Sequence, residues 1–260
     1  SSHIITSHMH RHFIKMQGLG NDFLVVRWPA DVPGPDANAV RRWADRRFGV
    51  GFDQLLIVDN DVNPGVDAAY RVFNADGGEV EQCGNGVRCV ARFLADETGK
   101  EELKLQSKAG MIVARVLPDE SITVNLGEPS FDPQTLPFQV ESKKDFYQLD
   151  IQAEEIEFGA VSLGNPHAVI AVDSVDVAPV DILGPALGSH SVFPRGVNVG
   201  FVEITNQTQV NLRVFERGVG ETPGCGTGAA AAVAVGRCWK ALAENVLVNL
   251  PGGTLSVNWA

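Results

Sequence analysis

The chain has 260 residues, of which 44% are hydrophobic and 20% are charged. This length suits one large domain or two small ones, and the composition is that of a folded globular protein rather than a disordered one. The formal net charge of -11 and the pI of about 5.0 argue against a nucleic-acid partner, because a phosphate backbone would be repelled over most of the surface.

The sequence shows no pattern typical of a membrane span or a secretory signal. The longest apolar run, residues 229–235, is far shorter than the roughly 18 residues that a span needs. Residues 1–8 lack the charged start and apolar centre of a signal peptide, and Met9 suits a native start, so we interpret residues 1–8 as a cloning remnant. Because four cysteines do not make a disulfide scaffold in a chain this long, we expect reduced thiols and a cytoplasmic location.

Taken in chain order, the apolar patterns predict many strands and two clear helices. One helix is predicted after Cys83-Gly84-Asn85-Gly86 and ends at Thr98-Gly99, and another follows Cys225-Gly226-Thr227-Gly228. The second is apolar on every side, so we expect sheet to surround it. Strands are predicted at residues 23–26, 54–58, 112–116, 122–125, 168–172 and 210–215.

The second half of the chain repeats motifs of the first. Arg71-Val72-Phe73 ends ten residues before Cys83, and Arg213-Val214-Phe215 ends ten residues before Cys225, an offset of 142 residues. Such an offset predicts a duplicated domain, and the turn formers of residues 127–133 mark the crossing point. We therefore expect an α+β fold with two pseudo-symmetric lobes, residues 9–127 and 128–260, each a strongly curved, mainly antiparallel sheet wrapped around a central helix.

A cysteine precedes each predicted helix, and this position favours a thiolate. The first amides of a helix lack intrahelical partners and lie at the positive end of its dipole, so an anion bound there is stabilised. Glycines 84, 86, 226 and 228 would let a ligand approach these amides. If both helix starts served one carboxylate, Cys83 and Cys225 could remove and return a proton on opposite faces of the neighbouring carbon. As a coupled pair, neither thiol is assigned as the permanent base.

The other cysteines have a simpler interpretation. Cys89 and Cys238 lie among apolar neighbours in the predicted helices, where a thiol usually fills space. Two alternatives stay open for Cys83 and Cys225. They could form a redox-active dithiol that alternates with a disulfide, although redox pairs commonly lie close in sequence, or they could belong to a binding module without catalysis.

Six ordered motifs resemble the diaminopimelate epimerase family, and the resemblance runs from Met9 nearly to Ala260. The motifs are Gly18-Leu19-Gly20-Asn21-Asp22-Phe23, Phe73-Asn74-Ala75-Asp76-Gly77, Cys83-Gly84-Asn85-Gly86-Val87-Arg88-Cys89, Gly164-Asn165-Pro166-His167, Gly196-Val197-Asn198, and Phe215-Glu216-Arg217-Gly218 with Cys225-Gly226-Thr227-Gly228.

The resemblance implies a PLP-independent isomerase, with no cofactor or metal, that interconverts LL- and meso-diaminopimelate in lysine and peptidoglycan-precursor synthesis, usually as a homodimer. It makes Cys83 and Cys225 the acid and base, places Glu216 at the reacting ammonium group and puts His167 near the thiols. The resemblance also implies a substrate-binding set: the amides of Gly84, Asn85, Gly86, Gly226 and Thr227 for the reacting carboxylate, Asn74, Asn165, Asn198 and Arg217 for the distal end, and Asn21 and Gln54 lining the site.

Some features depart from the family pattern. Gly78 stands where serine is usual, and Pro223-Gly224 precedes Cys225 where a small alanine-like residue is typical. Residues 256–260 end the chain where relatives continue into a threonine-glycine-proline segment that returns to the first lobe. The closest rival is a two-thiol racemase of another amino acid, such as proline or hydroxyproline, which would not need Arg217 to hold a distal carboxylate.

Overall fold

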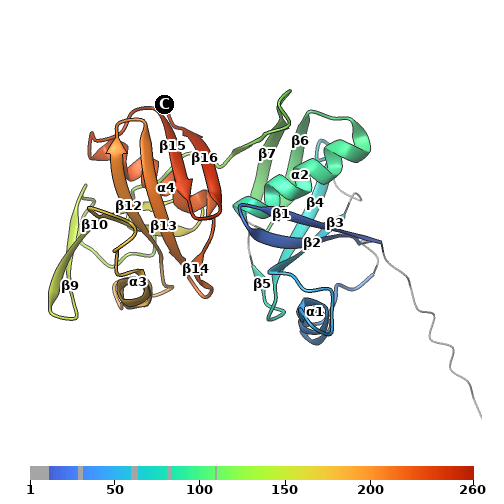
Figure 1. Cartoon of the computed structure of the whole chain (residues 1–260), viewed down its shortest axis with the longest axis horizontal. Coiled ribbons are helices and arrows are strands. Elements are labelled where there is room, and N and C mark those ends of the chain that lie inside the picture. Colours follow the sequence, from blue (N-terminus) through green and yellow to red (C-terminus); the bar gives the residue numbers. More distant parts are fainter. Residues whose placement is uncertain (1–11, 29–31, 60–63, 81–82, 109) are drawn as a thin grey trace, which may run out of the picture. The chain divides into compact units, whose positions relative to one another are not determined.

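The computed structural model describes residues 12–28, 32–59, 64–80, 83–108 and 110–260, so the interpretation of residues 1–8 and Met9 lies outside the described residues. The chain divides into two compact units (Figure 1). The first contains the described residues of 12–17 and 22–124, and the second contains residues 18–21 and 125–260. In the described part of the chain, no helix is both long and apolar enough to cross a membrane.

The first unit is an eight-stranded sheet with two helices among its described residues. The strand order is β1-β2-β3-β4-β6-β7-β8, with β5 paired to β4. β2 runs parallel to β3 and β4 parallel to β6, whereas β3 and β4 are antiparallel. The elements are β1 (Phe13–Gly18), β2 (Asn21–Arg27), α1 (Ala37–Ala44), β3 (Gln54–Asp59), β4 (Ala68–Asn74), β5 (Glu79–Val80), α2 (Gly84–Thr98), β6 (Glu102–Ser107), β7 (Gly110–Val116) and β8 (Ile122–Asn125).

The second unit is also an eight-stranded sheet, with two helices. Its strand order is β16-β15-β13-β12-β11-β10-β9, with β14 paired to β13. β11 runs parallel to β12 and β13 parallel to β15. The elements are β9 (Tyr147–Ile151), β10 (Glu154–Ser162), β11 (Pro166–Ala171), α3 (Val180–Gly188), β12 (Asn198–Asn206), β13 (Gln209–Glu216), β14 (Gly220–Thr222), α4 (Gly226–Cys238), β15 (Asn245–Leu250) and β16 (Gly253–Asn258).

The two units repeat one topology. Strands β2, β3, β4, β6 and β7 follow one another with the same directions as β11, β12, β13, β15 and β16. Even an ion pair is repeated, because Arg71 binds Glu79 as Arg213 binds Glu221, at the offset of 142 residues. The offset is 144 from Gln54 to Asn198, so it changes between β3 and β4, where the second unit has a tight hairpin at residues 207–208. The predicted fold class and duplication are confirmed.

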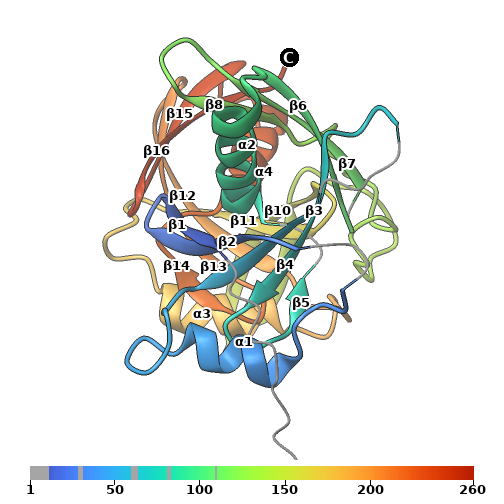
Figure 2. The same ribbon diagram turned by 90° about the vertical axis from the view of Figure 1, so that its right-hand side faces the viewer.

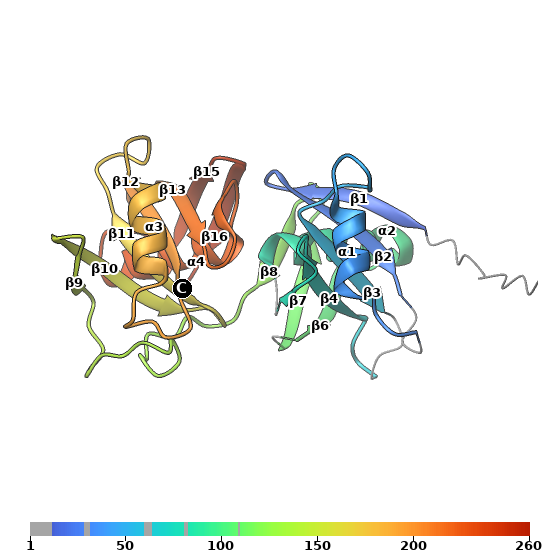
Figure 3. The same cartoon turned by 90° about the horizontal axis from the view of Figure 1, so that it is seen from below.

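Each sheet has one helix on each of its two faces. Neighbouring residues of a strand point to opposite sides, so apolar strand residues can pack against a helix on either face. In β2, Phe23 and Val25 pack with α2, whereas Leu24 and Val26 pack with α1. In the second unit α4 and α3 likewise pack with separate core clusters on the two faces of its sheet. Figure 2 shows α2 lengthwise, and Figure 3 shows α1 and α3 on the near faces of their sheets. The central helices are α2 and α4, the two that begin at cysteine motifs.

Candidate active site

Both motif cysteines are N-cap residues of the central helices. Cys83 precedes α2 with φ -139° and ψ 118°, and Cys225 precedes α4 with φ -129° and ψ 109°. Both sulfurs therefore lie at a helix start, where amide donors and the helix dipole favour negative charge. Cys83 is half-buried and Cys225 is 5% exposed, and both are free thiols.

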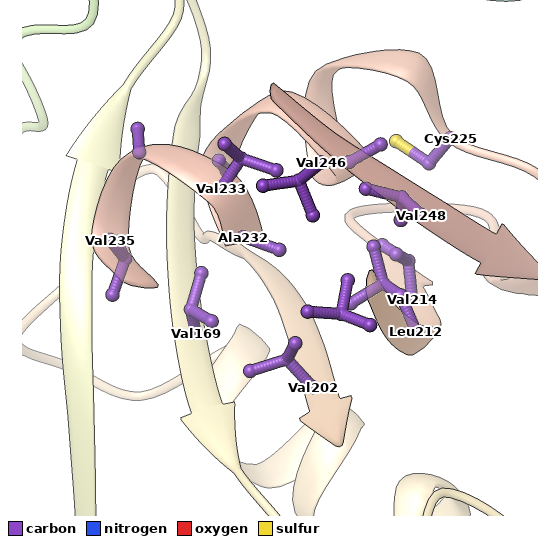
Figure 4. Packing of buried hydrophobic residues seen from close by; sticks show 14 of the residues in the cluster. Val169, Val202, Leu212, Val214, Cys225, Ala232, Val233, Val235, Val246 and Val248 are labelled. Atoms are coloured by element: carbon purple, nitrogen blue, oxygen red, sulfur yellow. The ribbon is translucent and has the colours of Figure 1, made fainter. Parts of the chain in front are cut away.

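In the second unit, a backbone amide and a hydroxyl group approach the Cys225 sulfur. The Gly228 amide donates to Sγ at 3.3 Å, and the Thr227 hydroxyl oxygen lies 3.6 Å from it. Because the Gly228 amide donates to the sulfur, helix geometry leaves the amides of Gly226 and Thr227 for a ligand. Figure 4 shows Cys225 at the margin of the apolar cluster around α4.

The second glycine of each motif has a packing role that the sequence analysis missed. A Cβ at Gly228 would lie 2.9 Å from Val214 Cγ2 and 3.2 Å from the Cys225 sulfur. A Cβ at Gly86 would lie 3.0 Å from Leu56 Cδ2. These two positions let the first helical turn approach the sheet, so ligand access is not the only reason for glycine there.

Glu216 ends β13 beside Cys225. Burial raises the pKa of its carboxyl group, and hydrogen bonds from Thr222 and Cys225 partly offset this rise. The Thr222 hydroxyl donates to Glu216 Oε1 at 2.5 Å. Sequence reasoning missed Thr222. The available signal was its position three residues before Cys225, in a Gly-Glu-Thr segment that repeats Gly78-Glu79 of the first half.

His167 lies near the second thiol but reaches it through other side chains. The imidazole is 1% exposed, and burial, followed by the charge of Arg217, lowers its pKa to about 3. Its Nε2 lies 3.0 Å from Asn165 Oδ1, and Asn165 Nδ2 donates to the Thr227 hydroxyl at 3.4 Å. At neutral pH His167 is therefore an uncharged hydrogen-bonding group.

Arg217 is held at both its backbone and its guanidinium group. Its amide donates to Asn198 Oδ1 at 2.9 Å, and its Nη1 donates to the Arg195 carbonyl at 2.8 Å. The Asn198 amide nitrogen in turn donates to the Pro166 carbonyl at 3.0 Å, so Asn198 links β11 to the end of β13. Arg217 lines a pocket of about 420 Å³ with Phe193, Phe215 and small residues of the α3 region. This places a guanidinium fork in a cavity where it can pair with a carboxylate.

In the first unit, the turn after Cys83 is tied to α2. Asn85 is 2% exposed, and its Oδ1 accepts from Arg88 Nη2 at 2.5 Å. Val87 donates its amide to the Cys83 carbonyl at 2.9 Å, which closes the first helical turn. Cys89 lies in the core, and burial raises its thiol pKa to about 12, in keeping with a space-filling role.

Gln54 and Asn74 form a pair of amides in neighbouring strands. Gln54 begins β3 directly opposite Asn74 at the end of β4, and Gln54 Nε2 donates to Asn74 Oδ1 at 2.8 Å. Gln54 Oε1 is buried, and no described residue donates to it. Gln54 Oε1 is therefore an acceptor that a donor group brought to this end of the strands could satisfy. Asn21 begins β2, next to the start of β3.

The predicted site residues occupy equivalent places in the two halves. Asn21 and Asn165 are 144 residues apart, as are Gln54 and Asn198, and Asn74 corresponds to Glu216 at the offset of 142 that also relates Cys83 to Cys225. The duplicated fold therefore places a thiol at a helix start in each unit. The sequence model of the diaminopimelate epimerase family matches residues 13–131 and 159–260.

The chain belongs to the diaminopimelate epimerase family.

Curated relatives with the same family name are similar over almost the whole chain. The diaminopimelate epimerase of Thioalkalivibrio sulfidiphilus is 51% identical over 254 residues, covering 95% of this chain and 90% of the relative. That of Ectopseudomonas mendocina is 48% identical over 252 residues, covering 95% and 91%. A hydroxyproline epimerase structure from Agrobacterium vitis, with trans-4-hydroxy-L-proline bound, has a TM-score of 0.67 at 18% identity and covers 95% of this chain and 83% of that one. This likeness shows a shared fold.

Two of the departures from the diaminopimelate epimerase pattern are accommodated locally. The Gly78 amide donates to Asp76 Oδ1 at 2.7 Å and its carbonyl accepts from the Asn74 amide at 2.8 Å, so the turn closes without a serine. A Cβ at Gly224 would lie 2.5 Å from Leu19 Cβ, so glycine before Cys225 permits a close approach of Leu19 within the second unit.

Proposed function

We propose that this chain is a cofactor-independent epimerase that interconverts LL- and meso-diaminopimelate in lysine and peptidoglycan-precursor synthesis. The observation that carries the proposal is the pair of N-cap cysteines at equivalent positions of a duplicated fold, in a member of the diaminopimelate epimerase family. Both helix starts offer amide donors to an anion, and both place a sulfur beside it.

In the proposed reaction, one cysteine is a thiolate and the other a thiol. The thiolate takes the proton from the α carbon, so a C–H bond breaks, an S–H bond forms and the electron pair spreads into the adjacent carboxylate. The amides at the helix starts, those of Gly84, Asn85, Gly86, Gly226 and Thr227, stabilise that charge, which is the largest expected catalytic term. The opposite thiol then donates its proton to the other face, which inverts the centre and leaves a thiolate there.

The remaining side chains bind and orient the substrate. Glu216 receives the reacting ammonium group, and neutral His167 assists near the thiols. We assign the distal amino-acid end to Asn74, Asn165, Asn198 and Arg217, with Asn21 and Gln54 lining the site. Asn198 acts mainly by fixing the Arg217 backbone, because its side chain already bonds two backbone groups.

Deuterium exchange tests the chemistry directly. In D2O, wild type with LL-diaminopimelate should place deuterium on the α carbon while the meso isomer appears. Cys83→Ala and Cys225→Ala should each reduce epimerisation by at least about a thousandfold, because each removes one of the two proton carriers. Cys89→Ala and Cys238→Ala are the matched controls and should keep most of the activity. Absence of label with wild type under reducing conditions would leave the redox and non-catalytic alternatives.

The substrate assignment has its own test. Arg217→Met should raise KM for diaminopimelate strongly, because the distal carboxylate loses its guanidinium partner. Arg195→Met is the matched control: it removes the same charge nearby but keeps the carbonyl that holds Arg217. Unchanged kinetics in Arg217→Met would favour a two-thiol racemase of another amino acid.

We further propose that the protein is a cytoplasmic homodimer, as the family resemblance implies. Light scattering coupled to size-exclusion chromatography should give about twice the 27.9 kDa chain mass. A monomer mass at assay concentration would contradict this part of the proposal.

A further inference from the structure

A continuous row of four side chains leads from a buried imidazole to the Cys225 sulfur. His167 Nε2 contacts Asn165 Oδ1 at 3.0 Å, Asn165 Nδ2 contacts Thr227 Oγ1 at 3.4 Å, and Thr227 Oγ1 lies 3.6 Å from Sγ. His167 and Thr227 are 1% and 5% exposed, so water does not compete freely for these groups. The row lies entirely within the second unit.

The chemistry of each group gives the row a direction. Asn165 presents its oxygen to His167, so the neutral imidazole carries its hydrogen on Nε2 and donates it. The Asn165 amide then donates to the Thr227 oxygen, and this occupies an acceptor site of the hydroxyl group. The hydroxyl hydrogen remains available, and the Cys225 sulfur lies within reach as an acceptor.

We propose that Thr227 is a positioning residue whose hydroxyl donates to Cys225 Sγ and stabilises its thiolate, and that Asn165 and His167 fix this orientation. The proposal rests on the proposed function only where it takes Cys225 as a proton carrier. Hydrogen bonds to the charged form of an acid favour that form, so Thr227 acts in the same sense as the Gly228 amide.

A charged group also reaches the sulfur. The Glu216 carboxylate hydrogen-bonds Cys225 and opposes a second negative charge there. Arg217 acts electrostatically on His167, and the core that contacts Cys225 is apolar, including Val214 and Val248. The hydroxyl and the amide therefore offset Glu216 when the sulfur is charged.

The first half of the chain carries different residues at the equivalent positions. Asn85 corresponds to Thr227, and Phe23 corresponds to His167, at the offsets of 142 and 144 residues. The equivalent positions of the first half therefore carry neither the hydroxyl group nor the imidazole. The duplication has given its two thiols different surroundings.

The test is a thiolate titration of the full chain with Cys225 as the only cysteine, made by Cys83→Ala, Cys89→Ala and Cys238→Ala. The ultraviolet absorbance of the thiolate is followed against pH, and the signal of a fully cysteine-free chain is subtracted to remove tyrosine. Thr227→Val in this background should move the midpoint up by about one pH unit, the size expected for losing one hydrogen bond to a charged group. Thr227→Ser should restore the midpoint to within a few tenths of a unit.

Several outcomes decide the proposal. Thr208→Val, a matched change in the β12–β13 hairpin, should leave the midpoint unchanged. If Thr227→Val does not fold, Thr227→Ala carries the same expectation. An unshifted midpoint in a folded Val or Ala variant, or an equal shift in Thr227→Ser, overturns the role of the hydroxyl. Deuterium labelling of diaminopimelate by wild type is run in parallel, so a failure of the proposed function appears separately from a failure of this inference.

Discussion

At the scale of single residues, Gly196 allows Arg217 to lie in its observed place. Gly196 has a φ of +70°, and a Cβ there would lie 2.9 Å from Arg217 Cδ. Gly196→Ala should displace the guanidinium group and raise KM for diaminopimelate about tenfold, with a smaller change in kcat, because binding of the distal end is weakened. Steady-state kinetics measure the effect.

A matched glycine separates this contact from backbone strain. Gly99 has a φ of +71° but open space around its missing Cβ, and it lies in the first unit, away from Arg217 in the chain. Gly99→Ala therefore carries a similar backbone cost, about 1 kcal/mol, without changing the surroundings of Arg217. A KM that rises equally in both variants would show that strain, not the Arg217 contact, causes the change.

Neutral His167 makes stability depend on pH. Its pKa is lowered to about 3 in the folded protein, against about 6.5 in an unfolded chain. Between these values only the unfolded state binds the proton, so the free energy of unfolding falls as pH decreases from about 6.5 towards 3. From pH 7 to pH 5, wild type should lose about 1 to 2 kcal/mol more than His167→Gln in urea unfolding.

The surface residue His12 provides the control for this prediction. It is exposed, so His12→Gln should keep the wild-type pH dependence. Protonation of carboxyl groups such as Glu216 contributes equally to the pH dependence of unfolding in all three proteins, so it cancels in the comparison. A His167→Gln variant with the wild-type slope would show that the imidazole is charged in the folded protein.

Sequence reasoning located residues with local roles, and it did not identify the partners of residues whose contacts are distant in the chain. Cys83 and Cys225 could be predicted as helix starts because the glycines and apolar spacing that define each helix follow directly. Asn198 could not be assigned to its partners, since they lie 32 and 19 residues away, at Pro166 and Arg217. Its amide resembles any capping asparagine until the strands are assembled.

At the scale of elements, sequence reasoning found the central helices, α2 and α4, and missed α1 and α3. α2 ends at Gly99 with a φ of +71°, as the Thr98-Gly99 signal predicted. α1 has only eight residues, and α3 contains Pro185 and internal glycines, so neither shows a long helical period. Both are stabilised by packing on the sheet, which local sequence does not reveal.

The starts of β2 and β3 are joined by a charge cluster that sequence reasoning also missed. Arg46 Nη1 and Nη2 donate to both oxygens of Asp22 at 2.9 and 2.7 Å, and Nη2 also reaches Asp53 at 2.7 Å. The Asp22 and Asp53 amides each donate to the other residue's carboxylate. The Asp53 carbonyl accepts from the Ala75 amide, so the cluster holds the residues next to both Gln54 and Asn74.

Arg46→Met should therefore lower the free energy of unfolding at pH 7 by about 1 kcal/mol. The value is modest because the Arg46 side chain is 56% exposed and because Lys15 still pairs with Asp22 in the variant. Arg46 holds the pKa of Asp22 well below its usual range. That contribution is present above the unfolded pKa of about 3.9 and is lost as pH falls, so the difference between variant and wild type should shrink below about pH 4.

A neighbouring arginine supplies the control for the cluster. Arg47→Met removes the same charge, but the described interaction of Arg47 is a backbone one, to Asp45. Its free energy of unfolding should stay within about 0.5 kcal/mol of wild type. Equal losses in the two variants would point to net charge rather than to the cluster.

At the scale of the whole molecule, the duplication was visible in sequence and the strand order was not. Repeated motifs revealed two halves because the helix starts and several predicted site residues recur in the second half at a nearly constant offset from the first. The parallel pairs β2–β3 and β4–β6, and their counterparts, depend on contacts between segments that no local pattern connects. The changed offset, from 144 to 142 residues, became interpretable only once β3 and β4 were placed.

The chain has one Cys83 motif and one Cys225 motif. The proposed reaction uses both thiols, so oxidation of either one should stop it. A thiolate is the form of cysteine that peroxide oxidises, so limited treatment should convert Cys83 or Cys225 to a sulfenic acid and abolish proton transfer. Epimerase activity should fall in step with modification of either residue, followed by peptide mass spectrometry, and excess thiol should restore it. The variant with Cys89→Ala and Cys238→Ala should lose activity at the wild-type rate. Full activity with Cys83 and Cys225 both oxidised would exclude thiols as the proton carriers.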